Sequence, residues 1–182
     1  MNWYVIFVKT GKEEDAVLDL RSKLNEDEFF AFVPMKETLF KKSGVVRRET
    51  EVLFPSYIFV ETDELGDACP RVLYEAVKDS CCCHRVLNYG NYECAAMHED
   101  ERELLFSLMN EDELIEASDA LLVGDRVMVT SGALQGYENR IISYDRHKRT
   151  AVIELCIMGR QSYVTVGMNT VVKVPETVGN GG

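Results

Sequence analysis

Three consecutive cysteines followed by a histidine are the nearest approach of this chain to a metal-binding or reactive motif. Cys81, Cys82, Cys83 and His84 all carry side chains that can bind zinc. Neighbouring side chains on a strand point to opposite faces, so at most two of the four, such as Cys82 and His84, can converge. No C-x-x-C pair elsewhere completes a site. We therefore expect small buried cysteines, no metal and no cofactor.

The remaining titratable residues form no catalytic pattern. His84, His98 and His147 fall in different segments, and no nucleophile motif accompanies them. The chain has no H-E-x-x-H sequence and no glycine-rich phosphate loop. The acidic clusters at 99–103 and 111–113 fit a helix start and a linker. The sequence thus predicts a binding protein, not an enzyme.

Two short runs of cations are candidates for binding nucleic acid through its phosphates. The first run has five cations and one acid, Glu37, and comprises Lys36, Lys41, Lys42, Arg47 and Arg48. The second stands where a turn normally has Gly, Asn or Asp, and comprises Arg146, His147, Lys148 and Arg149, with Arg140 and Arg160 as candidate additions. Both runs are equally compatible with solvated turns.

The overall charge argues against a nonspecific nucleic-acid coat or an anionic-membrane protein. The chain has 182 residues, 20 Lys and Arg against 31 Asp and Glu, and a net charge of −11. Its 46% apolar content is typical of a globular protein. The excess acid lies in residues 1–119, because residues 120–182 have seven Lys and Arg against five acids. Local basic patches are therefore compatible with the acidic total.

The targeting signals favour a cytoplasmic protein. The apolar start of the chain has no basic residues before it and is interrupted at Lys9, unlike a signal peptide. No apolar stretch reaches the roughly 20 residues that a membrane helix needs. The six cysteines match no secreted disulfide framework. We expect a cytoplasmic, bacterial monomer with no membrane contact.

Hydrophobic periodicity predicts two domains. Residues 1–110 mix strands and helices, whereas residues 120–175 contain only short strands separated by turns. These strands are expected at 126–130, 139–144, 151–158, 162–166 and 170–174. Residues 111–119 are acidic and are expected to form a linker, and residues 176–182 a flexible tail. The fold class is α+β followed by a small five-stranded barrel.

Three segments together resemble the NusG family of transcription elongation factors. They are Trp3-Tyr4-Val5 with Gly11-x-Glu13, the run Leu53-Phe54-Pro55-Ser56-Tyr57-Ile58-Phe59-Val60-Glu61, and Gly124-Asp125-Arg126-Val127 with Gly132-x-x-x-Gly136. The first two are similar to the family's N-terminal NGN domain, and the third to a KOW motif. The KOW pattern has Asn139 where a glycine is usual, and Asn tolerates left-handed backbone well. The amino-acid sequence at 7–14 and 53–57 is most similar to that of specialised paralogues such as the LoaP antiterminator.

The resemblance implies a ferredoxin-like α/β sandwich, an SH3-like barrel and a polymerase-binding role. Tyr57 and Phe59 lie two apart on a strand and share one face. Apolar alternation alone favours a core position for both rings, but the matching family positions help to hold the clamp helices of RNA polymerase. Tyr4 and Phe7 are candidates for the same patch. The basic runs would contact nascent RNA or the non-template DNA strand.

The resemblance leaves several functions open. The first is an antitermination factor for long operons, in which RNA or another factor is recruited by the barrel. The second is the housekeeping elongation factor that couples polymerase to Rho or the ribosome, and Leu134 counts against it because an aromatic residue is usual there. A ribosome-associated KOW protein is a third. Because the last segment is rich in β-branched residues, we expect a barrel at rest, although some family members store this domain as helices.

Overall fold

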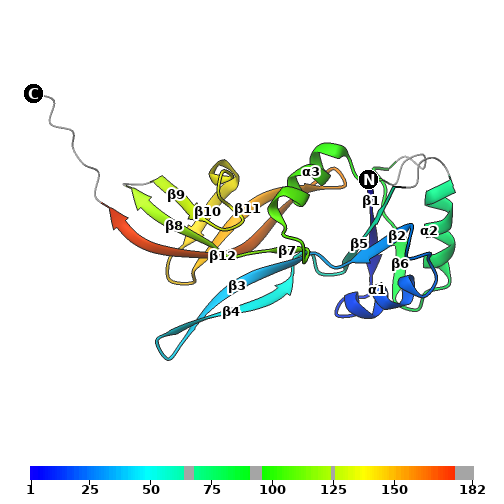
Figure 1. Cartoon of the computed structure of the whole chain (residues 1–182), viewed down its shortest axis with the longest axis horizontal. Coiled ribbons are helices and arrows are strands. Elements are labelled where there is room, and N and C mark those ends of the chain that lie inside the picture. Colours follow the sequence, from blue (N-terminus) through cyan, green and yellow to red (C-terminus); the bar gives the residue numbers. More distant parts are fainter. Residues whose placement is uncertain (64–67, 91–95, 124–125, 175–182) are drawn as a thin grey trace, which may run out of the picture.

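The computed structural model describes residues 1–63, 68–90, 96–123 and 126–174. Its N-terminal part contains a four-stranded antiparallel sheet in the order β2-β5-β1-β6, at the right of Figure 1. The strands of this sheet and the helices between them are β1 (Asn2–Val8), α1 (Glu13–Arg21), β2 (Phe29–Phe32), β5 (Tyr57–Thr62), α2 (Ala68–Lys78) and β6 (Cys83–Val86).

Alternation along β1 separates two hydrophobic clusters, one on each face of the sheet. Tyr4 and Ile6 pack with residues of α1 and α2. Trp3 and Val5 pack on the opposite face, together with residues of α3 (Glu99–Leu108). All four β1 side chains are buried. Helices therefore cover both faces of this sheet, as a two-faced apolar strand requires.

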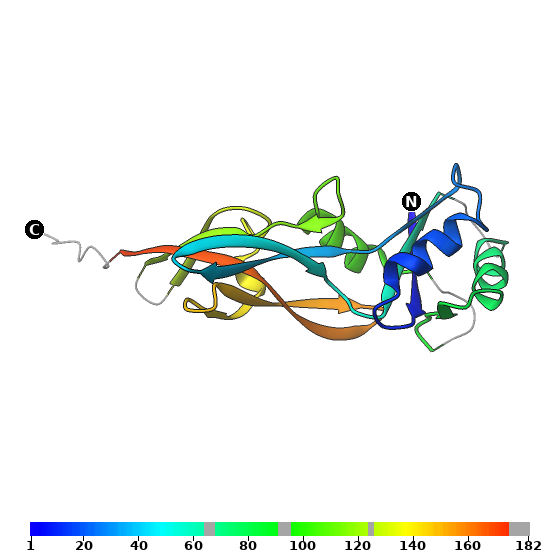
Figure 2. The same ribbon diagram turned by 90° about the horizontal axis from the view of Figure 1, so that it is seen from below.

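A long hairpin leaves the sheet between β2 and β5. Its strands are β3 (Met35–Lys42) and β4 (Val45–Val52). Ser43 and Gly44 both have left-handed backbone, with φ of 53° and 84°, as a two-residue hairpin turn of the primed type requires. Figures 1 and 2 show the hairpin extending away from the N-terminal sheet and alongside the C-terminal domain. The first basic run of the sequence therefore lies on this hairpin.

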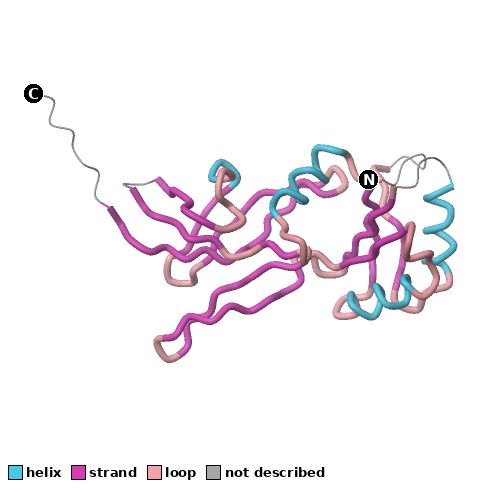
Figure 3. The backbone as a smooth tube through the Cα atoms, in the orientation of Figure 1, coloured by secondary structure: helices cyan, strands magenta, loops and turns pink. Residues whose placement is uncertain are grey.

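The C-terminal domain is a strongly bent five-stranded sheet in the order β10-β11-β12-β8-β9. Figure 3 shows that strands make up most of it, with loops and a short helix between them. Its elements are β8 (Ser118–Val123), β9 (Arg126–Ser131), the 3₁₀ helix η1 (Glu138–Arg140), β10 (Ile141–Asp145), β11 (Thr150–Ile157) and β12 (Arg160–Val174). The described part of the domain contains five strands, as expected in number, and is in the extended state and not helical.

Two details of the predicted strands are wrong. The expected separate strands at 162–166 and 170–174 are one strand, β12, whose first part pairs antiparallel with β11 and whose last part pairs parallel with β8. Gly167 does not make a turn, and a Cβ atom there would lie 2.9 Å from the Glu37 carbonyl oxygen. Close packing against the hairpin therefore explains this glycine. The fifth strand is β8, which begins in the segment expected to be a linker.

The acidic segment 111–119 is packed rather than free. Leu114–Ile115 forms the short strand β7, which pairs in parallel with Met35 and Lys36 of β3. Ile115 is completely buried, and the backbone N–H of Ala117 donates to the Glu37 carboxylate at 2.7 Å. The composition of this segment suggested solvent exposure, but its few apolar residues are the ones that hold it to the hairpin.

The two domains are joined through a buried carboxylate. Glu101, in the first turn of α3, accepts hydrogen bonds from the backbone N–H groups of Met158 and Gly159 at 3.1 and 2.8 Å. Its side chain also accepts from the Cys156 thiol at 3.0 Å and from the Tyr89 hydroxyl at 2.6 Å. One hydrophobic cluster runs from the N-terminal sheet through α3 into the barrel. The domains therefore form a continuous body in this structure.

Candidate functional site

A partly exposed aromatic patch lies at the end of β1 and on its two neighbouring strands. The Phe7 ring lies 5.6 Å from Tyr57 and 5.2 Å from His84, measured between ring centroids. The Arg85 guanidinium lies 6.0 Å from the centroid of the same Phe7 ring. Strand register explains the cluster, because Phe7 pairs with Tyr57 on one side and with Arg85 on the other. We call Phe7, Tyr57, His84 and Arg85 the aromatic patch.

Two residues expected in this patch lie elsewhere. Tyr57 and Phe59 do share a face of β5, but Phe59 is completely buried among Trp3, Phe32 and Phe54. Residues of α3 belong to the same hydrophobic cluster as Phe59, so this part of the sheet face is core. Tyr4 points to the opposite face and is buried with α1 and α2. Direct contact with a partner in this conformation is therefore available to Tyr57 and Phe7, not to Phe59 or Tyr4.

Sequence reasoning missed His84 and Arg85 as members of the patch. Both side chains are exposed on β6. The preceding cysteines drew attention to metal binding, and nothing local indicates that β6 pairs with β1. Alternation could not have found them either, because two adjacent residues, His84 and Arg85, are both exposed between the buried Cys83 and Val86.

The five-cation hairpin is electrostatically divided along its length. Near its base, Lys36 lies 3.8 Å from the Glu51 carboxylate, and Arg48 lies 2.8 Å from the Glu37 carboxylate. The three exposed cations nearer the tip make no ion pair with any residue that the structure describes, and they are Lys41, Lys42 and Arg47. The tip is therefore the part of the hairpin with uncompensated positive charge.

The second basic run forms the turn between β10 and β11. Asp145 stabilises the turn, because its carboxylate accepts hydrogen bonds from the backbone N–H groups of His147 and Lys148 at 2.8 and 2.9 Å. These backbone hydrogen bonds lower the pKa of Asp145. Arg149 is directed inward, where its guanidinium donates to the Asn169 side chain. The exposed cations of this turn are therefore Arg146 and Lys148, beside His147.

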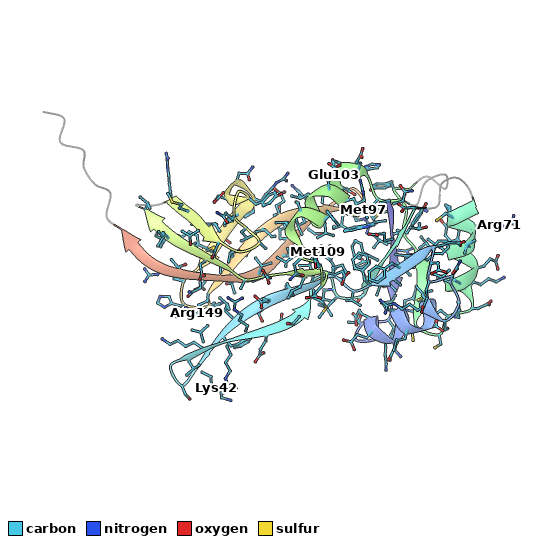
Figure 4. All side chains as sticks on the ribbon, in the orientation of Figure 1. Lys42, Arg71, Met97, Glu103, Met109 and Arg149 are labelled. Carbon is cyan, nitrogen blue, oxygen red and sulfur yellow. The ribbon has the colours of Figure 1, made fainter. Side chains whose placement is uncertain are left out.

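The structure brings the hairpin and this turn together around one groove. A cavity of about 430 Å³ lies between them, with Phe40 and Lys41 on the hairpin side and His147 and Lys148 on the barrel side. Figure 4 shows Lys42 at the hairpin tip and Arg149 on the neighbouring barrel edge, on the same side of the molecule. Phe40 is 53% exposed. An exposed aromatic ring between cations is a suitable platform for a single-stranded base. We call this the basic groove.

The two candidate additions to the second run lie away from the basic groove. Arg140 ends η1, which follows β9 on the side of the barrel opposite the hairpin (yellow in Figure 1). Arg160 begins β12 and borders a cavity of about 350 Å³ at the junction of the two domains, opposite Arg85. Although Arg140 and Arg160 are near the second basic run in the sequence, they do not line the basic groove.

The two glycines of the KOW turn differ in how much space surrounds them. Gly132 has φ of 89°, and a Cβ atom there would lie 2.5 Å from the Ala117 carbonyl oxygen. Gly136 also has left-handed backbone, with φ of 85°, but has open space around it. Asn139 lies inside η1 and not at a left-handed position, so the reason expected for it is wrong. Gly124 and Asp125 of the same motif lie outside the described residues.

The cysteine-rich segment forms no metal site in the part of the chain that the structure describes. No group of three or more His, Cys, Asp or Glu side chains within these residues is placed to hold a metal ion. Cys83 is buried, and burial raises the pKa of its thiol. The Cys81 and Cys82 sulfurs lie 3.6 Å apart. Cys94 lies outside the described residues.

Comparison with known proteins identifies the family. Residues 1–105 match the family described as "Transcription termination factor nusG". The chain belongs to the NusG family. Proteins of this NusG family are transcription factors that bind RNA polymerase. No helix among the described residues of this NusG protein is long and apolar enough to cross a membrane.

Among solved structures, this NusG-family chain is similar to one described as showing domain interaction in Thermotoga maritima NusG. The two share 18% sequence identity with a TM-score of 0.50, over 91% of this chain and 93% of the other. At that identity the likeness supports the two-domain NusG fold. No curated protein matches the chain by sequence.

Proposed function

We propose that this NusG-family factor is a specialised paralogue of the LoaP type, which binds RNA polymerase through the aromatic patch and promotes processive transcription of long operons. The observation that carries the proposal is the exposed cluster of Phe7, Tyr57, His84 and Arg85. It is the open remainder of a sheet face that α3 otherwise covers. Rigid rings at the edge of a packed core supply contact area with little loss of side-chain entropy.

The basic groove supplies a second contact in this proposal, with nascent RNA or the non-template DNA strand. The exposed Phe40 ring would stack on a base, while Lys41 and Lys148 would contact phosphates. Because the rest of the chain is acidic, such a contact would be local and would follow polymerase binding.

The housekeeping role is the second candidate, and the position of Leu134 argues against it. The resemblance places an aromatic docking residue at this position in the housekeeping factor. In this chain Leu134 is completely buried, and its backbone N–H donates to the Ser118 hydroxyl at 2.9 Å. Neither feature offers a docking side chain to Rho or to the ribosome.

Co-purification with core RNA polymerase tests the polymerase contact. We expect the double substitution Phe7→Ala and Tyr57→Ala to lower affinity at least about tenfold, because hot-spot rings each contribute about 2 kcal/mol. Phe59→Ala is unsuitable because it opens a cavity in the core. Tyr163→Ala, which removes a 60% exposed ring from the barrel, is the matched control. Unchanged affinity of the double variant would contradict the proposal.

Single-round transcription in vitro separates the two candidate functions. The proposed paralogue should increase readthrough of a terminator and shorten pauses, and the Phe7 and Tyr57 variant should not. Enhancement of Rho-dependent termination by the wild-type chain would instead establish the housekeeping role.

A further inference from the structure

A second aromatic site lies at the opposite end of β1 from the aromatic patch. A cavity of about 350 Å³ opens between the edge strand β2 and the end of α3. Its aromatic rings are Trp3, Phe30, Phe32 and Phe106. Its rim includes the carboxylates of Glu61, Glu111 and Glu113. Neither the polymerase contact nor the basic groove uses these residues. We call this cavity the acidic aromatic pocket.

The rings form a floor and two walls. Trp3 and Phe32 are buried and meet edge to face at 5.3 Å. Phe30 is stacked beside Phe32 at 5.7 Å, and Phe106 lies 6.2 Å from Trp3. Phe30 and Phe106 remain 42% and 57% exposed. Phe106 is the more exposed of the two rings and has no cation over it among the described contacts, so its ring is available to a cationic guest.

The charge around the pocket is predominantly negative, and the nearby Arg21 guanidinium offsets only part of the charge of Glu113. Glu61, Glu111 and Glu113 form no ion pair with any described residue, and Glu61 accepts a hydrogen bond from the Trp3 indole at 2.7 Å. Burial, followed by the nearby charge of Asp112, raises the pKa of Glu113. The Arg21 guanidinium lies 5.3 Å from the Phe30 centroid, so this ring already engages one cation.

The acidic surface continues beyond the pocket along the edge of the sheet. An adjoining cavity of about 280 Å³ shares Phe30 and Glu61 with the first one. Its other carboxylates are Glu26, Asp27, Glu28 and Asp63, of which Asp63 alone is paired among the described residues, with the N-terminal amine at 2.7 Å. Two connected acidic cavities can accommodate an extended ligand with more than one positive charge.

We propose that the acidic aromatic pocket binds an arginine side chain of a basic, extended segment of a partner protein. The planar guanidinium stacks against Phe106, and its donors face the Glu61 and Glu113 carboxylates. A second cation of the same segment lies in the adjoining cavity. Nucleic acid is disfavoured as the occupant because its phosphates would be repelled by the carboxylates that line both cavities.

Trp3 is the only tryptophan of the chain and reports directly on the pocket. The probe is a capped peptide with two arginines separated by glycine, titrated into the full chain while the Trp3 indole N–H is followed by NMR. We expect the arginine peptide to shift this resonance and the same peptide with neutral citrulline to bind at least about tenfold more weakly. Higher salt should weaken binding of the arginine peptide but not of the citrulline peptide.

Matched variants locate the binding. Phe106→Ala should lower the affinity for the arginine peptide about three- to thirtyfold. Glu113→Gln should also lower this affinity. Glu103→Gln, an exposed acid on the outer side of α3 in Figure 4, should not. Equal binding of the arginine and citrulline peptides, no shift of the indole, or equal loss in the Glu103 control would each overturn the proposal. Loss of polymerase binding plays no part in this test, so the two proposals can fail separately.

Discussion

Gly132 and Gly136 show at the residue scale why one motif glycine matters more than another. Both have left-handed backbone, with φ of 89° and 85°. A Cβ atom at Gly132 would lie 2.5 Å from the Ala117 carbonyl oxygen and 2.6 Å from the Ser118 Cα. At Gly136 no atom lies within 4 Å of the same position. The first glycine therefore serves both conformation and packing, the second only conformation.

This difference predicts unequal losses of stability. Gly136→Ala should cost about 1 to 2 kcal/mol of unfolding free energy, the strain of left-handed backbone in an L-residue. Gly132→Ala should cost about 2 to 5 kcal/mol, because overpacking against the β8 backbone adds to the strain. Urea unfolding of both variants, followed by far-UV circular dichroism, measures the two values. Equal losses of unfolding free energy would show that the backbone at Ala117 can move away from a Cβ atom at position 132 without cost.

At the scale of elements, local patterns predicted strands and helices well but not which surfaces they leave open. The alternation of Tyr57 and Phe59 placed both rings on one face, and the structure agrees. Phe59 is buried in a cluster that also contains Phe32 and the α3 residue Leu105, both distant from it in the sequence. The pairing of β6 with β1, which adds His84 to the patch, is equally nonlocal. Periodicity reports the near neighbours of a residue and not its distant ones.

The basic groove is also a property of two elements, and neither predicts it alone. The sequence identifies the two basic runs separately, but their convergence follows from the packing of β12 against β3, where Gly167 meets the Glu37 backbone. Ion pairs with Glu51 and Glu37 then remove Lys36 and Arg48 from the available charge. The cations available to bind nucleic acid are those that form no ion pair within the folded chain.

Charge reversal across the groove tests its role in binding nucleic acid. Lys41→Glu with Lys148→Glu should weaken single-stranded RNA binding and reduce the slope of log affinity against log salt by about 1.4, from about 0.7 for each phosphate contact. Arg140→Glu with Arg160→Glu makes the same change of charge outside the groove and is the control. Fluorescence anisotropy with a labelled oligonucleotide provides both quantities. If the two double variants lose affinity equally, overall charge and not the groove determines binding.

For the whole molecule, the net charge of −11 is the sum of surfaces with opposite character. The sheet edge beside Phe30 is acidic, whereas the groove beside Phe40 is basic. These surfaces have fixed relative positions only while the two domains stay in contact. Glu101 is central to that contact, because it accepts hydrogen bonds from three residues of the barrel and from Tyr89.

The charge state of Glu101 should therefore control how the domains are held. Burial raises the pKa of this carboxyl, but hydrogen bonds from Cys156, Tyr89 and two backbone N–H groups outweigh burial and lower it below the ordinary 4.5. Because the pKa of Glu101 is lower in the folded protein, the ionised carboxylate stabilises the domain contact fully above pH 4.5. This stabilisation is lost as the pH falls through the folded-state pKa. The domain contact should accordingly weaken on acidification, not at alkaline pH.

Glu101→Gln should reproduce that loss at neutral pH. The amide group turns one acceptor into a donor that faces the donors of the barrel, which should weaken the contact by on the order of 3 kcal/mol. NMR relaxation of the two domains measures the effect: a joined wild-type chain tumbles as one body, and the variant should show faster, independent tumbling of the barrel. Glu103→Gln, on the exposed side of the same helix, should behave as wild type. Joint tumbling of the Glu101 variant would place the contact energy in the shared hydrophobic cluster instead.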